Sequence, residues 1–197
     1  YELAKLYIKL GDVWKQTKNE DYKFYKKKAY DICTQAEIEC KGAKALVNCT
    51  NLKNDIILKK NAILKIEKVE SVNKPIKALL QYQNIDEAEI ILIKFDLNRG
   101  LEFYKSLDYF LRKNSTKYLN KKIENIKRYN IKLSNEDDYQ EHSTEIKIDP
   151  LDEGFYGIIV RDGKNKKNKD SFISVNSFQV SNIAYIERET ANGEKEI

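Results

Sequence analysis

The chain has 197 residues, with 36 Lys and Arg against 31 Asp and Glu, which gives a formal charge of +5. A hydrophobic content of 41% with only 7 Gly and 2 Pro excludes collagen-like and Gly/Pro-rich disordered chains. No apolar run reaches the roughly 20 residues that a membrane-spanning helix needs. Basic residues are interleaved with acidic ones throughout, which indicates a solvated surface and not a nucleic-acid site.

Three amphipathic helices are predicted within residues 1–57. Apolar residues recur at spacings of three and four over 2–17, on one face of a helix. Asp21 is the expected N-cap of a second helix that stops at Gly42, and apolar residues from 45 to 56 indicate a third. Because the connections are short, we expect the three helices to pack as antiparallel neighbours.

The first helix resembles the first helix of a tetratricopeptide repeat in its pattern Tyr7-x-x-Leu10-Gly11-x-x-Trp14. In such a repeat a small residue lets the paired helix approach, and aromatic residues fill the groove. The match covers half a repeat, and no second copy occurs in the sequence. We therefore expect a small helical cap and not a peptide-binding solenoid.

Near Ile57 the hydrophobic period changes from about 3.6 to 2, as expected where helices give way to strands. Strand segments then follow over 58–182, and their number and spacing predict an antiparallel β-sandwich of the immunoglobulin-like type. The segments are 64–67, 78–82, 89–95, 129–133, 144–148, 155–160 and 171–180. The turn-like Asn84-Ile85-Asp86-Glu87 predicts a hairpin between the second and third of them. The expected fold class is α+β, and residues 183–197 are expected to begin a following domain or a linker.

Two segments between these strands differ from the rest. Residues 99–127 carry apolar residues at helical spacing, which predicts a helical insertion in the sandwich. Residues 162–170 form a polar hairpin tip that contains four lysines. Because no aromatic residue is interleaved there for base stacking, we interpret the tip as a solvated loop and not as a phosphate-binding patch.

The spacing of the cysteines, Cys33, Cys40 and Cys49, fits neither a zinc site nor a thiol-redox motif, and we expect no metal or other cofactor. If the second and third helices are antiparallel about a turn near Gly42, Cys33 and Cys49 lie opposite each other. Two states stay open. One is a disulfide with one free thiol, and the other is three reduced thiols, with Cys33 and Cys49 as small apolar fillers between the helices.

His142 is the only histidine, so a Ser/His or Cys/His catalytic pair would have to include it. No glycine-rich elbow or oxyanion turn accompanies it, and Cys49 belongs to the helical segment. Dinucleotide-binding, P-loop and zinc-protease motifs are absent from the sequence. The interpretation is a structural histidine at a strand end or domain seam, in a protein that is not an enzyme.

Several longer stretches carry a family resemblance. The most specific is Asp138-Tyr139-Gln140-Glu141-His142-Ser143-Thr144-Glu145-Ile146, followed by Leu151-Asp152-Glu153-Gly154-Phe155-Tyr156. Asn73-Lys74-Pro75 with the following strand, and the passage from Phe178 to Ile186, add to it. Together they resemble the amino-terminal region of the bacterial alpha-2-macroglobulin-like proteins, in which a macroglobulin domain would here follow the helices. The motif residues Tyr139, Gln140, His142, Ser143, Thr144 and Glu145 are expected to be structural.

The resemblance implies an exported protein of the periplasm or cell surface, made of a string of macroglobulin sandwiches. The chain begins at Tyr1 and contains no Met, so we expect a processed or excised segment. Its partners would be the downstream macroglobulin domains of the same protein and target proteases, with any membrane anchor outside this segment. The implied setting is oxidising, which favours a Cys33–Cys49 disulfide worth on the order of 3 kcal/mol. The Cys-x-x-Gln thioester of better-known members is absent around each cysteine.

The function expected on this basis is that of a non-catalytic amino-terminal module in protease trapping, protease inhibition or envelope defence. The alternative is an adaptor of the cell envelope that binds a partner through its helices or a sheet edge. A hydrolase that uses His142 is a third hypothesis, and the residues around His142 support it least.

Overall fold

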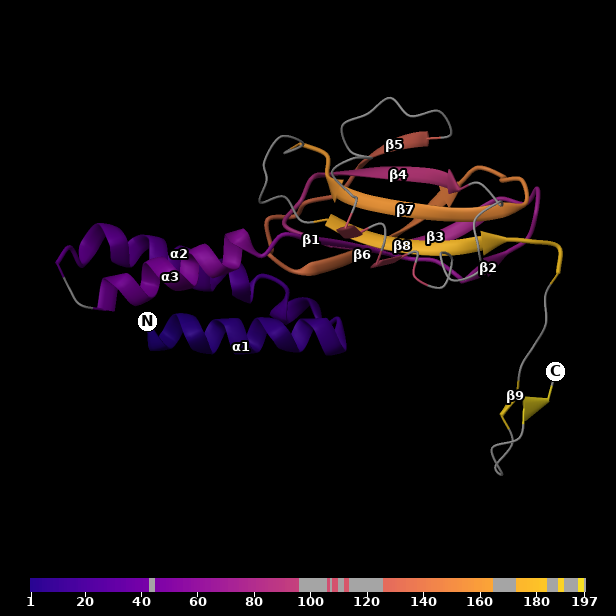
Figure 1. Ribbon diagram of the computed structural model, residues 1–197. Helices are drawn as coiled ribbons and strands as arrows, with labels where there is room; N and C mark the ends of the chain where they lie inside the picture. Colours follow the sequence, from indigo (N-terminus) through magenta and orange to yellow (C-terminus); the bar gives the residue numbers. More distant parts are fainter. Residues whose placement is uncertain are drawn as a thin grey trace.

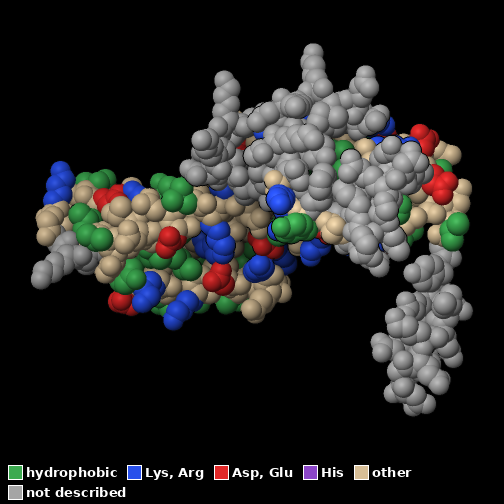
Figure 2. Space-filling model, viewed as in Figure 1, with side chains coloured by type: hydrophobic (Ala, Val, Ile, Leu, Met, Phe, Trp, Pro, Cys, Tyr) green, Lys and Arg blue, Asp and Glu red, His purple; other side chains and the backbone are tan. Residues whose placement is uncertain are grey.

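A computed structural model of the chain describes residues 1–42, 45–95, 106, 108–109, 112–113, 126–164, 173–183, 188–189 and 195–196. The fold is α+β, with a layer of helices beside one end of a β-sandwich (Figure 1). On the face shown in Figure 2, basic and acidic side chains are interspersed over the helices. None of the described helices is both long and apolar enough to cross a membrane.

The helices are α1 over Glu2–Thr17, α2 over Tyr25–Glu39 and α3 over Ala45–Leu58. They run back and forth beside one another (Figure 1), because short connections leave no other packing. Small residues at the contacts let the helices approach closely, and larger apolar side chains fill the space around them. The buried residues of this helical core are Ala4, Ala29, Cys33, Cys49 and Ile56.

Asp21 does not cap the second helix, contrary to the sequence prediction. It lies in a 3₁₀ turn over Glu20–Tyr22, and its backbone N–H donates to Asn19 Oδ1 at 3.0 Å. Asn19 is therefore the capping residue of the turn, and α2 begins only at Tyr25, without a side-chain cap. Asn19, two residues before Asp21, forms an Asx turn, and the 3₁₀ turn that it caps occupies the place where α2 was expected to begin.

The sandwich is made of a three-stranded and a five-stranded sheet. The first has the order β1-β3-β6, and the second has the order β2-β8-β7-β4-β5. The strands are β1 Asn61–Lys65, β2 Val69–Glu70, β3 Ile76–Gln83, β4 Glu87–Phe95, β5 Ile126–Lys132, β6 Glu141–Ile148, β7 Gly154–Asp162 and β8 Ile173–Val180. With β1, β3 and β6 as strands A, B and E, and β4, β7 and β8 as strands C, F and G, the arrangement is immunoglobulin-like, as the sequence predicted.

Two features of the sheets differ from the prediction. The predicted hairpin between the segments that form β3 and β4 does not occur. β3 pairs with β1 and β6, whereas β4 pairs with β5 and β7. Asn84, at φ 53°, turns the chain from one sheet to the other, and its amide donates to the carbonyl of Ile56 at 2.6 Å. The sandwich is also not entirely antiparallel, since the short strand β2 pairs in parallel with β8.

The main core lies between the two sheets. Inward-facing residues of both sheets alternate with outward-facing ones, as expected of a sandwich. Fully buried members include Leu64, Leu80, Ile90 and Ile158. β4 and β7 are buried on their outer face as well, where Ile91 and Ile159 are 0% exposed.

The predicted helical insertion over 99–127 lies mostly outside the described residues. The predicted end of the insertion at residue 127 is wrong, because Ile126 and Lys127 already belong to β5 and pair with β4. Most of the lysine-rich tip over 162–170 also lies outside the described residues, although the strands it joins, β7 and β8, pair as expected. Within 183–197, two short strands, β9 over Arg188–Glu189 and β10 over Lys195–Glu196, pair with each other, and a following domain or linker there stays a prediction.

Candidate functional site

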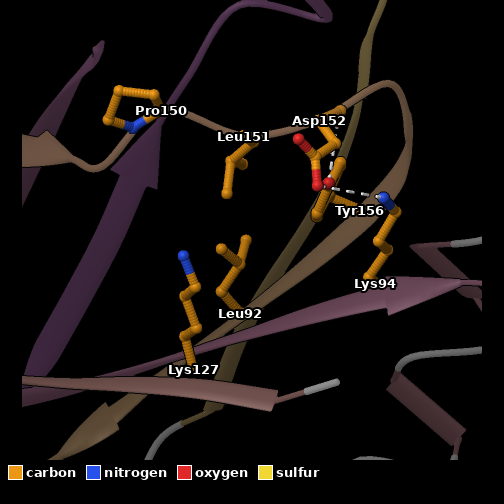
Figure 3. A pocket seen from close by; sticks show the side chains of 7 residues that line it. All are labelled: Leu92, Lys94, Lys127, Pro150, Leu151, Asp152 and Tyr156. Atoms are coloured by element: carbon orange, nitrogen blue, oxygen red, sulfur yellow. Dashed lines mark hydrogen bonds and ion pairs between the residues drawn. The ribbon is translucent and has the colours of Figure 1, made fainter. Parts of the chain in front are cut away.

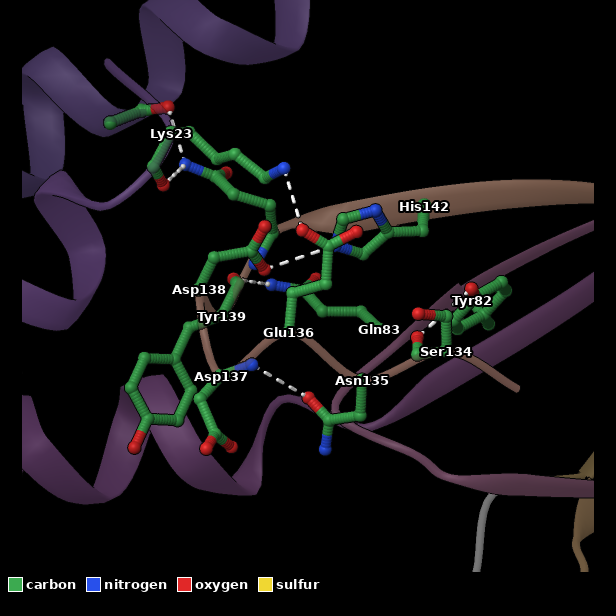
Figure 4. A network of polar contacts seen from close by, with 12 residues as sticks. Lys23, Tyr82, Gln83, Ser134, Asn135, Glu136, Asp137, Asp138, Tyr139 and His142 are labelled. Atoms are coloured by element: carbon green, nitrogen blue, oxygen red, sulfur yellow. Dashed lines mark hydrogen bonds and ion pairs between the residues drawn. The ribbon is translucent and has the colours of Figure 1, made fainter. Parts of the chain in front are cut away.

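The residues of the sequence motif gather where the helices meet the sandwich. The loop before β6, residues 134–140, lies against α1 and the turn that precedes α2 (Figure 4). Its backbone is unusual, because Asp137 and Tyr139 have left-handed φ values of 54° and 59°. Asp137 is held by its N–H, which donates to Asn135 Oδ1 at 3.1 Å. We call this region the joint.

Gln140 connects the two parts of the molecule. Its side chain is 1% exposed, and its Nε2 donates to the carbonyl oxygens of Gly11 at 3.0 Å and Lys23 at 3.1 Å. One amide therefore binds α1 and the segment before α2 at the same time. A glycine is needed at position 11, because a Cβ there would lie 2.8 Å from Lys26 Cγ and 3.2 Å from the backbone nitrogen of Lys26.

His142 is enclosed by a carboxylate and two aromatic rings. Its Nε2 lies 3.0 Å from Asp138 Oδ1, which also accepts the backbone N–H of Gln140 at 2.9 Å. The imidazole ring centre is 5.5 Å from that of Trp14 on α1 and 5.8 Å from that of Tyr82 on β3. A carboxylate and an imidazole are two of the three members of a catalytic triad, but the other contacts of His142 found among the described residues are with aromatic rings.

Further polar contacts surround the joint. Lys23 pairs with Glu136 at 2.6 Å, and this hydrogen bond raises the pKa of Lys23 above its ordinary value. Gln83 Nε2 donates to the carbonyl of Tyr139 at 2.8 Å, which fixes the loop to β3. The ring of Tyr139 lies 5.2 Å from the ring of Tyr30 on α2, and burial raises the pKa of Tyr139. The loop is thus held from both the helical side and the sheet side.

The motif divides into two parts in the structure. Tyr139, Gln140 and His142 lie in the joint, as described. Ser143, Thr144 and Glu145 continue along β6, opposite residues of β3, and extend away from the joint. Sequence reasoning did not predict that Gly11, Trp14, Lys23 and Asp138 are the partners of these residues, although it had singled out Gly11, Trp14 and Asp138 as parts of motifs.

Cys33 and Cys49 lie side by side within the helical core. Both are buried. Burial first, and the neighbouring Cys49 second, raise the pKa of Cys33 to about 11. Both are free thiols in the structure, as is the exposed Cys40. The disulfide stays a prediction. In the reduced state, Cys33 and Cys49 are small apolar side chains that fill the space between the helices.

The described part of the chain contains no candidate metal site. No group of three or more His, Cys, Asp or Glu residues lies close enough there to hold a metal ion. Two of the three carboxylates of the joint instead pair with basic side chains, Asp138 with His142 and Glu136 with Lys23. The arrangement is suited to fixing two parts of a protein together.

Comparison with known proteins adds only distant likenesses. No family model and no curated protein matches the chain. Among solved structures, it is similar to the CARDB domain of a Pyrococcus furiosus protein in complex with di-metal ions, at 14% identity and a TM-score of 0.34, over 62% of this chain and 92% of that one. It is also similar to the PmoD soluble domain from Methylocystis sp. ATCC 49242 (Rockwell), at 10% identity and a TM-score of 0.30, over 58% and 78% respectively. Likenesses this distant carry no argument about function.

Proposed function

We propose that this chain is a non-catalytic module in which helices and sandwich form one rigid body. In keeping with the resemblance of its motif, we place it at the amino-terminal end of an exported alpha-2-macroglobulin-like protein that traps or inhibits proteases. The rigid-body proposal depends mainly on the side-chain amide of Gln140, just before β6. This amide donates to the carbonyl oxygens of Gly11 on α1 and of Lys23 before α2. A module of this kind sets the position and direction of whatever is attached to its ends.

The absence of catalysis is part of the proposal. His142 has its hydrogen bond to Asp138 and lies between two aromatic rings, which leaves it a structural role. Replacement by Ala is expected to lower stability without removing any hydrolytic activity. Loss of a measurable activity in the His142→Ala protein, at a temperature where it is still folded, would contradict this.

Rigidity is testable by distance measurement. Cys40 is exposed at the end of α2, and Lys147 is exposed on β6, so nitroxide labels on Cys40 and on the Lys147→Cys variant report across the joint. A single narrow distance distribution is expected, and Gln140→Ala should broaden it. Gln16→Ala, an exposed change on α1, is the matched control and should leave it narrow. An equally narrow distribution in Gln140→Ala, or a broad one in the parent chain, would overturn the proposal.

The adaptor remains a second candidate because of the surface of the helices. Large apolar side chains are exposed there, with Leu3 at 54%, Leu6 at 52% and Val47 at 63%. Figure 2 shows hydrophobic side chains among charged ones over this part of the molecule. Leu3 and Leu6 are three residues apart on α1 and so are neighbours on one face of that helix, and exposed apolar side chains that lie together often mark a protein contact.

An affinity-capture experiment separates the two candidates. The module of a larger protein should retain no stoichiometric partner except polypeptide of that same protein. An unrelated stoichiometric partner, lost in a Leu3→Glu and Leu6→Glu double variant and kept in a Lys147→Glu control, would establish the adaptor. The exposed positions of all three residues mean that these changes should not unfold the chain.

A further inference from the structure

One end of the sandwich core carries two lysines at inward-facing positions. On β4 the core-facing residues alternate as Ala88, Ile90 and Leu92, and the next position of this series is Lys94. On β5, Lys127 lies opposite Leu92 in the register, and the residues two and four positions along, Tyr129 and Ile131, pack against the core. Lysine at such positions is unusual, because the pleat points its side chain between the sheets.

A cavity of about 240 Å³ lies at this end of the core, and both lysines line it. Its apolar part is made by Leu92 and Leu151, which point toward each other in Figure 3, with Pro150 beside them. Its other wall is Tyr156, whose hydroxyl donates to the carbonyl of Asp152 at 2.8 Å. The cavity therefore has an apolar part and a polar edge, which carries the ammonium groups of Lys94 and Lys127 and the carboxylate of Asp152.

The wall of the cavity is held in place by the sheets. The carbonyl of Leu151 accepts the backbone N–H of Asn73 at 3.0 Å, which attaches the loop between β6 and β7 to the segment before β3. Tyr156 is buried against Phe178, with the ring centres 5.5 Å apart. The burial of Tyr156 also raises its pKa, so its hydroxyl stays neutral near pH 7. A preformed apolar cavity with a few polar groups is typical of a small-ligand site.

Within the described part of the chain, the two ammonium groups at the mouth face one lining carboxylate, that of Asp152. Among the described residues, Lys94 Nζ pairs with the carboxylate of Asp152 at 4.0 Å, which is 86% exposed, and no ion pair of Lys127 is found. The other nearby acid, Asp149, is exposed and lies 3.4 Å from the hydroxyl of Tyr129. Lys94 Nζ is 5.7 Å from the ring centre of Tyr156. Two ammonium groups thus lie at one edge of the cavity against a single, largely exposed carboxylate.

We propose that this cavity binds a small amphiphile with an anionic head, of the medium-chain carboxylate class. The carboxylate would lie between the ammonium groups of Lys94 and Lys127, and the alkyl tail would lie against Leu92 and Leu151. The volume is below the range of about 300 to 1,000 Å³ typical of drug-sized ligands, which suits one short chain. The inference is independent of the proposed function, since it uses a different end of the sandwich.

Titration with octanoate, followed by amide chemical shifts of the full chain, tests the proposal. We expect shifts confined to residues around Leu92 and Leu151, with a dissociation constant of about 1 mM or tighter. Lys127→Gln should weaken binding by about tenfold, as expected for loss of one charge-assisted hydrogen bond. Lys132→Gln, an exposed lysine five residues along the same strand and so on the opposite face, is the matched control and should bind as the parent does.

Two further ligands separate the parts of the proposal. Acetate has the head without the tail, and octyltrimethylammonium has the tail with the opposite charge, so both should bind at least tenfold more weakly than octanoate. Equal binding of either one, unchanged octanoate binding in Lys127→Gln, or no saturable shifts at all would overturn the assignment. Because Lys127 is exposed, the variant is expected to fold, and its unfolding midpoint verifies this.

Discussion

Replacing Gln140 with glutamate tests whether the joint depends on two donated hydrogen bonds. The change is nearly isosteric, but it converts the amide that donates to the carbonyls of Gly11 and Lys23 into a carboxylate that can only accept. The side chain is 1% exposed, so water cannot replace the lost donors. A negative charge would then face two carbonyl oxygens inside the protein.

The magnitude follows from this geometry. Two hydrogen bonds with net values of about 1 kcal/mol each are lost, and burial of an unpaired charge adds to that, which gives a total of about 3 to 5 kcal/mol at pH 7. Gln140→Met loses the same two bonds. It also removes Gln140 Oε1, which has no partner in the structure, so it should cost only about 1 kcal/mol. Gln16→Glu, on the exposed face of α1, should change stability by less than about 0.5 kcal/mol.

Urea unfolding at two pH values measures these differences. Trp14 is the only tryptophan and lies in the joint, so its fluorescence reports unfolding of the relevant region. The buried new carboxyl group has a folded-state pKa above its unfolded value of about 4.3, because burial disfavours its charged form. The protonated variant is therefore more stable, and its stability is lost as the pH rises from below about 4 toward neutrality.

The stability of each variant is compared with that of the parent chain at the same pH. At pH 4, Gln140→Glu should be nearly as stable as Gln140→Met, and at pH 7 it should be much less stable. Equal stability of the two variants at pH 7 would refute the reasoning. It would mean that the joint opens or takes up water at little cost, and that Gln140 does not hold the helices.

Three further outcomes are expected. Gly11→Ala should lower the free energy of unfolding by about 1 kcal/mol in urea, since crowding against the backbone nitrogen of Lys26, 3.2 Å from the new Cβ, outweighs the gain in helix propensity; a more stable variant would contradict this. After incubation in an oxidising buffer and denaturation without reductant, thiol titration should find one free thiol, as expected for a Cys33–Cys49 bond that stabilises by about 3 kcal/mol, whereas three would exclude that bond. Asp86 has a pKa held below its ordinary value of 3.8 first by the hydrogen bond from Lys164, so Asp86→Asn should cost under about 1 kcal/mol at pH 7, and thermal melts should show this difference disappearing as the pH falls through the folded-state pKa.

Local patterning was sufficient for much of the fold. The boundaries of α1, the change from helices to strands near Ile57 and the positions of the longer strands follow from side-chain period alone, because each element must bury one face. The stretch around Gln140 and His142 was also visible in the sequence, and a structural role for His142 stays a prediction. These features depend on residues close to one another along the chain.

Only the tertiary structure decided how these elements pair and what their side chains meet. The segment at Asn84 has the composition of a hairpin turn, yet it passes between two sheets, because its amide binds the end of α3. Gln140 acquires its role from carbonyls more than a hundred residues away in sequence, and Lys94 and Lys127 share a cavity only because β4 and β5 are paired. Period and propensity describe a residue's neighbours along its own element, whereas these contacts depend on register and on the packing of one element against another.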